Sequence, residues 1–142
     1  MKRVLEGGFE LDDDLARIDV AEVHRFISEE SYWAPGRPYA VQEELIEAAT
    51  RVVGLYDGQR QIGFCRATTA VGIPFVYLAD VYVLSDYRGR GLGVELVREM
   101  IEAGPLADRR WILHTGDAHG LYSRFGFEHP VMKVMERPSP AG

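Results

Sequence analysis

The chain has a single cysteine, no long hydrophobic run and no excess of basic residues, and each shortage excludes a class of protein. Cys65 cannot form an intramolecular disulfide, and no second thiolate is present to share a zinc ion with it. No apolar run reaches the roughly 18 residues of a membrane-spanning helix. The chain also turns acidic near its start, where a signal peptide needs an apolar stretch. The sequence therefore predicts a soluble, cytoplasmic protein with no membrane association, in which Cys65 is a buried, inert thiol.

Positive charge is also scarce. Lysine and arginine number 16 against 22 aspartates and glutamates, for a net charge of -6. A protein that grips a nucleic-acid backbone non-specifically needs the opposite balance. The charge predicts no nucleic-acid partner and is compatible with a small cationic partner, although ordinary soluble surfaces carry a similar charge.

What is present is an ordinary globular composition. The chain has 142 residues, of which 46% are hydrophobic and 27% are charged. These values suit one domain with a buried core and leave no room for a second. We therefore expect a single domain over residues 1–142.

Hydrophobic periodicity divides the chain into helices and strands. The nearly continuous apolar run Phe75–Val83 predicts a central strand with both faces covered. Tyr32–Pro38 contains two prolines and a glycine, so it is expected to be a loop. The other predicted strands are Phe9–Leu11, Arg51–Tyr56, Gln61–Thr69, Trp111–His114 and Val131–Met135, and the predicted helices are Asp19–Ser31, Val41–Ala49, Leu92–Gly104 and Ala118–Arg124. This order predicts an α/β (α+β) fold, a mixed sheet with helices on its faces.

The strongest local signal follows the central strand, where residues 88–93 read Arg-Gly-Arg-Gly-Leu-Gly and lead into a helix. Glycines let backbone amides approach a ligand closely, and a helix N-terminus adds unpaired N–H groups and partial positive charge. The segment lacks the Lys-Ser/Thr of a Walker A loop, and its glycine spacing differs from the dinucleotide fingerprint. It indicates either a phosphate or pyrophosphate site, or a tight turn that binds nothing.

A second signal lies in residues 117–127, Asp-Ala-His-Gly-Leu-Tyr-Ser-Arg-Phe-Gly-Phe. Here a short predicted helix carries Tyr122, whose phenol is protonated at neutral pH and can donate a proton. The alternative is a tyrosine that only packs in the core.

Together the two segments resemble the GCN5-related N-acetyltransferase (GNAT) superfamily. Its signature is Arg/Gln-x-x-Gly-x-Gly/Ala after a central strand, followed downstream by Tyr-x-x-x-Gly-Phe. Here these motifs occupy residues 88–93 and 122–127, and the agreement in order and spacing spans roughly residues 51–130. The resemblance implies a mixed, mostly antiparallel central sheet flanked by helices and splayed at an acetyl-CoA cleft.

The resemblance also implies an acetyl-CoA cosubstrate and no metal. The backbone of Val81, Tyr82 and Val83 would pair with the pantetheine arm, with an N–H near Val81 polarising the thioester carbonyl. The pyrophosphate would be held by Arg88, Gly89, Arg90, Gly91, Leu92 and Gly93. Thr115 would hydrogen-bond the cofactor, and Tyr122 would protonate the departing thiolate.

The acceptor side is less determined. Many relatives have a glutamate on the central strand where this chain has Ala79, and the next residue, Asp80, is the only charge in that strand. Asp80 therefore has either a structural role or a catalytic role toward the amine. The family usually builds its acceptor site on the loop that contains Tyr32, Trp33 and Arg37; aromatic residues suit a cation, Arg37 suits a carboxylate, and Trp33 could instead only pack.

The predicted function is transfer of an acetyl group from acetyl-CoA to a primary amine of a small molecule or peptide, by a monomer or homodimer. A non-catalytic acyl-CoA sensor of the same fold is the main alternative, since Ala79 replaces the frequent glutamate. Nucleotide binding at the glycine-rich segment is a weaker alternative. The sequence assigns no role to His114, Asp117 or His119.

Overall fold

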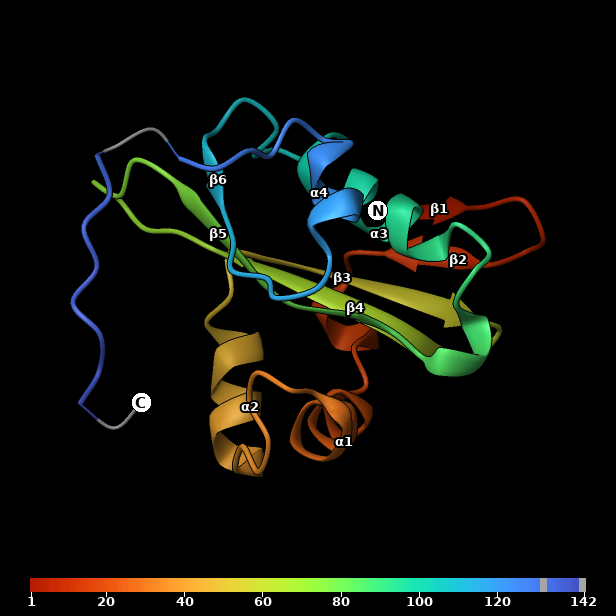
Figure 1. Cartoon of the computed structure of the whole chain (residues 1–142). Coiled ribbons are helices and arrows are strands. Elements are labelled where there is room, and N and C mark those ends of the chain that lie inside the picture. The colour runs from red at the N-terminus through yellow and green to blue at the C-terminus, as the bar shows by residue number, and fades with distance from the viewer. Residues whose placement is uncertain (131–132, 141–142) are drawn as a thin grey trace.

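The computed structural model describes residues 1–130 and 133–140 and contains a six-stranded sheet in the order β1-β2-β3-β4-β5-β6 (Figure 1). The strands are β1 Lys2–Val4, β2 Glu10–Asp12, β3 Arg51–Asp57, β4 Arg60–Thr68, β5 Val76–Val83 and β6 Trp111–Ile112. Neighbouring strands are antiparallel except β5 and β6, which are parallel. The predicted mixed, mostly antiparallel sheet is confirmed.

Helices cover both faces of this sheet. Helices α1 Val20–Glu30 and α2 Tyr39–Glu47 lie on one face, and α3 Leu92–Ile101 and α4 His119–Ser123 lie on the other (Figure 1). Short 3-10 turns cover Leu15–Arg17 and Ser85–Tyr87.

Helix α1 begins where its sequence predicts. The side chain of Asp19 accepts a hydrogen bond from the Glu22 N–H, which satisfies one of the free amides of the first turn. Val23, Phe26 and Ile27 are buried, and the ring of Phe26 stacks on Tyr82 of β5 with centroids 3.9 Å apart. The apolar stripe therefore fixes α1 against the sheet beside the end of β5.

The prediction that residues 75–83 form a central strand covered on both faces is wrong in one respect. Strands β3 and β4 are the ones buried along nearly their whole length. Along β5, by contrast, Tyr77, Ala79 and Val81 are only half-buried, and the next strand, β6, has just two residues. The apolar residues of this strand therefore form part of an accessible surface.

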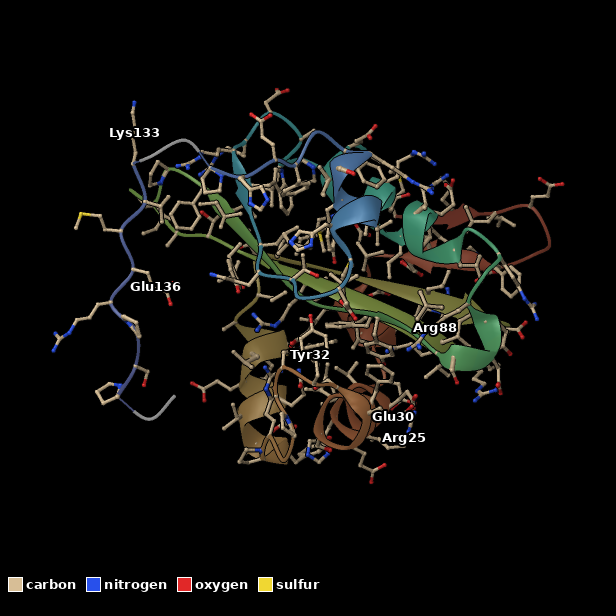
Figure 2. All side chains as sticks on the ribbon, viewed as in Figure 1. Arg25, Glu30, Tyr32, Arg88, Lys133 and Glu136 are labelled. Carbon is tan, nitrogen blue, oxygen red and sulfur yellow. The ribbon has the colours of Figure 1, made fainter. Side chains whose placement is uncertain are left out.

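The two ends of the chain also differ from the prediction. Strand β1 was not predicted, and it pairs with β2 through residues 2–4. The strand predicted over Val131–Met135 starts at residues outside the described part, and residues 133–135 belong to no strand. Figure 2 shows Lys133 and Glu136 on a segment that runs apart from the sheet. No helix within residues 1–130 and 133–140 has the length and apolarity needed to cross a membrane.

The one cysteine lies at the centre of the sheet. Cys65 on β4 is 0% exposed, and this burial raises the pKa of its thiol. Because the thiolate is the reactive form, we expect a thiol reagent at pH 8 to leave the native protein unlabelled within minutes. After unfolding in guanidinium, the same reagent should label one thiol per chain. Rapid labelling of the native protein would contradict this burial.

Candidate functional site

The central irregularity of the sheet is a bulge in β5 at Asp80. The pairing of β4 with β5 shifts between Phe64 and Arg66, so that two residues of β5, Asp80 and Val81, lie opposite Cys65 alone. Asp80 has a φ of 55°, the one positive φ of a non-glycine residue in the described chain. Such a conformation is held only where surrounding contacts favour it, and it tends to mark functional sites.

The bulge changes which backbone groups face the open edge of β5. The Val76 N–H donates toward β6 (2.8 Å), whereas the Leu84 N–H donates to a carbonyl of β4 (2.8 Å). Backbone groups alternate in direction along a strand. Val76 and Leu84 would therefore point the same way in a regular strand, and the extra residue at the bulge explains why they do not. Beyond the bulge, Val81 and Val83 direct their backbone groups away from β4. Strand β6 pairs only with the first two residues of β5. The expected splay is therefore present, and the edge beyond it has no strand partner in the described residues.

The glycine-rich segment lies next to this edge. Gly91 is the N-cap of α3 with a φ of 78°, and no side chain caps the helix. The amides of Leu92, Gly93 and Val94, in the first turn, therefore need an external partner. A pocket of about 300 Å³ opens here, and its lining consists of Val83, Arg88, Gly89, Gly91, Leu92, Gly93, Val94, Leu121 and Arg124. Free amides, a helix N-terminus and two arginines suit a pyrophosphate.

The structure separates the two arginines of the motif. Arg88, labelled in Figure 2, donates from Nε to the Val83 carbonyl (2.9 Å) and lines the pocket. Arg90 does not line it, and its guanidinium lies 5.4 Å from the ring centroid of Tyr87. Sequence analysis missed Arg124, although it lies two residues after Tyr122 within the second motif.

Tyr122 combines burial with an unpaired phenol. It is 8% exposed, and its ring packs edge-on against Phe127 with centroids 5.8 Å apart. Its neighbours in sequence, Leu121 and Arg124, line the pocket at the start of α3. The hydroxyl has no hydrogen bond in the described structure and is not fully enclosed. Burial raises the pKa of Tyr122, so the phenol remains protonated at neutral pH.

Asp80 lies in a cluster with Trp33, Arg37 and Arg66, which we call the Asp80 cluster. Oδ2 accepts from Arg37 Nη1 (2.7 Å) and Arg66 Nε (2.9 Å), and Oδ1 accepts from Trp33 Nε1 (3.0 Å). Burial alone would raise the pKa of Asp80, but Arg66 and Arg37 outweigh it and hold the pKa below its ordinary value. A carboxylate that is 1% exposed and held by three donors is a poor base, so these contacts favour the structural alternative.

The loop between α1 and α2 also contacts the loop before α4. The Gly116 N–H donates to the Tyr32 hydroxyl (2.9 Å), and that hydroxyl donates to Asp117 (3.3 Å). Figure 2 places Tyr32 at the top of the α1 and α2 layer, facing the sheet. Thr115, predicted to bind the cofactor, accepts the Ala118 N–H (3.0 Å) and so supports the start of α4.

Two histidines lie near these loops. Nδ1 of His114 is 2.8 Å from the Tyr77 hydroxyl, and the ring of His119 lies 6.0 Å from that of His129. No set of three metal-ligating side chains occurs among residues 1–130 and 133–140.

Comparison with known proteins agrees with this geometry. The family profile described as acetyltransferase (GNAT) domain matches residues 48–129. A GNAT-family protein from Xanthomonas campestris pv. campestris is 35% identical, with a TM-score of 0.82 over 93% of this chain and 94% of that chain.

Two further structures share the fold at lower identity. A protein from Staphylococcus aureus is 21% identical, with a TM-score of 0.71 over 92% of this chain and 99% of that one. A GNAT-family acetyltransferase from Brucella melitensis, solved with acetyl-CoA, is 19% identical, with a TM-score of 0.66 over 84% and 82%. No curated protein matches the sequence. The family profile and the Xanthomonas protein confirm the resemblance carried by the two motifs, and the chain belongs to the GNAT family of acetyltransferases.

Proposed function

We propose that this protein is an N-acetyltransferase that moves an acetyl group from acetyl-CoA to a primary amine of a small molecule or peptide by direct attack. The observation that carries the proposal is the open backbone edge of β5, which ends at a pocket lined by the uncapped start of α3 and by Leu121 of α4, the helix that carries Tyr122. An extended thioester with a pyrophosphate needs a backbone edge, an anion site and a proton donor, and this part of the molecule offers all three.

The described residues fit acetyl-CoA. The free amides of Leu92–Val94, with Arg88 and Arg124, would hold the pyrophosphate. Val81 and Val83 would pair with the amides of the pantetheine arm, as an added strand pairs with a sheet edge. Bound acetyl-CoA would supply an activated acetyl thioester, and no metal is required.

The backbone at the bulge would stabilise the developing charge. When the amine attacks, a nitrogen–carbon bond forms and negative charge grows on the carbonyl oxygen. A fixed N–H near Val81 would donate to that oxygen, and preorganised donors of this kind strongly favour acyl transfer. The positive φ of Asp80 (55°) accompanies the register shift that exposes this N–H.

Tyr122 would complete the transfer. As the carbon–sulfur bond breaks, its phenol donates a proton to the leaving sulfur and is later reprotonated from solvent. The amine loses its own proton to water. Asp80 is a positioning residue here, because its carboxylate holds Trp33 and Arg37 beside β5.

Release of CoA thiol over time, with a panel of amines, tests the proposal. We expect thiol release that depends on both acetyl-CoA and an amine. Binding of acetyl-CoA without turnover of any amine would favour the sensor alternative, and tighter binding of ATP or NAD would favour the nucleotide site.

The cofactor segment can be tested with two matched glycines. Gly91 and Gly72 both have positive φ (78° and 85°), and neither has an atom within 4 Å of the Cβ position. Alanine should therefore cost each about 1 kcal/mol of stability through backbone strain. Only Gly91→Ala should weaken acetyl-CoA binding, by about tenfold in calorimetric titration, because it disturbs the turn that directs the free amides. Equal binding by Gly91→Ala and Gly72→Ala would contradict this site.

A further inference from the structure

The Asp80 cluster has more positive than negative charge. Arg37 and Arg66 both bind the same carboxylate oxygen, and their side chains are only 14% and 10% exposed. The described structure gives neither arginine a second carboxylate. One buried positive charge is therefore unbalanced, which is costly unless a ligand balances it.

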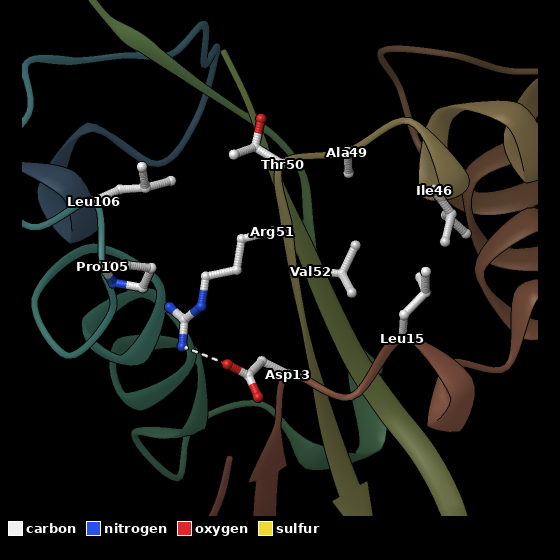
Figure 3. A pocket seen from close by; sticks show the side chains of 9 residues that line it. All are labelled: Asp13, Leu15, Ile46, Ala49, Thr50, Arg51, Val52, Pro105 and Leu106. Carbon is white, nitrogen blue, oxygen red and sulfur yellow. Dashed lines mark hydrogen bonds and ion pairs between the residues drawn. The ribbon is translucent and has the colours of Figure 1, made fainter. Parts of the chain in front are cut away.

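A second buried arginine shows the contrast. Arg51 contacts two carboxylates, Asp13 at 3.2 Å and Glu99 at 3.6 Å, and also caps the end of α3 through two carbonyls. Figure 3 shows Arg51 pointing to Asp13 across its pocket. Two carboxylates therefore face this one arginine, although they also pair with Arg3 and the N-terminal ammonium, whereas at the Asp80 cluster two buried arginines share one carboxylate.

Several donors of the Asp80 cluster are unused. Arg37 bonds through Nη1 alone, to Asp80 and to Gln42 (2.8 Å). Arg66 uses Nε, and its Nη1 reaches Thr68 only at 3.4 Å. In the described structure, Arg37 Nε and Nη2 and Arg66 Nη2 have no acceptor, and none of them is fully enclosed. These donors can therefore meet a ligand from outside.

The cluster also lies at the point of acetyl transfer in the proposed function. Asp80 immediately precedes Val81, the residue proposed to hold the carbonyl oxygen. Tyr32 and Trp33 stand over it as an edge-to-face pair, with centroids 5.1 Å apart and exposures of 58% and 41%. Trp33 is therefore not a buried packing residue, and its indole N–H already donates a hydrogen bond to Asp80.

We propose that the acceptor amine carries an anionic group, a carboxylate in the first place, which binds the free guanidinium edges of Arg66 and Arg37 while its apolar part contacts Trp33. This rests on the proposed function. A planar carboxylate matches a guanidinium edge. The surplus positive charge also disfavours a nearby ammonium, which favours the neutral amine that can attack. For the same reason a di- or polycationic amine should be a poor acceptor.

Matched pairs of acceptors test this in the wild-type protein. Phenylalanine is compared with phenylalaninamide and with phenethylamine, which lack the carboxylate, and with the corresponding aminophosphonate, which carries a different anion. We expect kcat/KM at least tenfold higher for phenylalanine than for either amine that lacks the carboxylate. A phosphonate that equals the carboxylate would support the anionic site and broaden the substrate class.

Variants locate the effect. Arg66→Gln should remove the preference for the carboxylate, so that the ratio of kcat/KM between phenylalanine and phenylalaninamide falls close to one while the KM for acetyl-CoA is unchanged. Arg66→Lys should restore part of that preference. Arg109→Gln, at an exposed arginine that bonds only the Ile73 carbonyl, is the matched control and should keep the full preference. If Arg66→Gln does not fold, the carboxylate preference of the wild-type protein and its reduction in Arg66→Lys test the proposal instead.

The outcomes separate this inference from the function. Equal turnover of acceptors with and without the anionic group would overturn the anionic site and leave the acetyltransferase intact. If no amine is acetylated, N-acetylphenylalanine and N-acetylphenylalaninamide serve as binding probes. Equal stabilisation of the protein by the two, or stabilisation by neither, would also overturn the anionic site. Absence of acetyl-CoA binding would overturn the proposed function itself.

Discussion

Replacing Asp80 by asparagine is expected to lower the free energy of unfolding by about 3 kcal/mol at pH 7. The substitution keeps the size of the side chain but removes the charge that Arg37 and Arg66 share. Two buried guanidinium groups would then face each other without compensation. For a domain of this size the melting temperature should fall by roughly 10 °C.

The pH dependence of this loss gives a second readout. The folded pKa of Asp80 is below the ordinary value of 3.8, so its ionised form stabilises the folded state above that value. The stabilisation is lost as pH falls through the folded pKa. The difference in stability between wild type and Asp80→Asn should therefore be constant near neutral pH and shrink below about pH 4.

Denaturant unfolding across pH measures both effects. Asp108→Asn, at an exposed aspartate, is the control and should change stability by less than about 0.5 kcal/mol. An Asp80→Asn protein that is as stable as wild type but inactive would show that the carboxylate acts on the amine.

Replacing Tyr122 by phenylalanine is expected to lower kcat at least about tenfold, near or below the lower end of the roughly 10²–10⁴-fold typical of a positioned proton donor. The effect is at the lower end because a buried phenol is a weak acid toward a thiolate whose pKa is about 8.5. The KM for acetyl-CoA should change little, since proton donation matters in the transition state.

Tyr56→Phe is the matched control, because its buried hydroxyl donates to the Arg17 carbonyl at 3.2 Å. That variant should lose about 1 kcal/mol of stability and keep its rate. Tyr122→Phe should keep its stability, because the hydroxyl has no protein partner in the described structure. Wild-type turnover by Tyr122→Phe, with chemistry rate-limiting, would reduce Tyr122 to a packing residue.

The sequence predicted best what depends on neighbouring residues. The cap at Asp19 and the hairpin between the strands predicted over residues 51–56 and 61–69 each involve groups a few positions apart, and both are present, the hairpin with its turn at Gly58-Gln59. The two motifs likewise identified the family, because each is defined by residues a few positions apart in the sequence.

Long-range contacts could not be predicted in this way. The sequence marked Asp80 as an isolated charge, but its partners lie 14 and 43 residues earlier in the chain. Only the pairing of β4 with β5 and the path of the α1–α2 loop bring Arg66 and Arg37 to it. The surplus of positive charge at this point is therefore a property of the fold.

The part of the chain that departs most from prediction is the face of β5. Its apolar sequence is typical of a covered strand, yet Tyr77 and Ala79 are half-buried. A surface that binds an apolar ligand needs the same residues as a core, so composition alone does not distinguish the two.

Amide hydrogen exchange with and without saturating acetyl-CoA reports where the cosubstrate lies along the chain. We expect increased protection of the amides of residues 81–83 and 89–94, with residues 49–52 in the separate pocket beside Arg51 unchanged. Protection confined to that second pocket, or no change at saturation, would contradict this expectation.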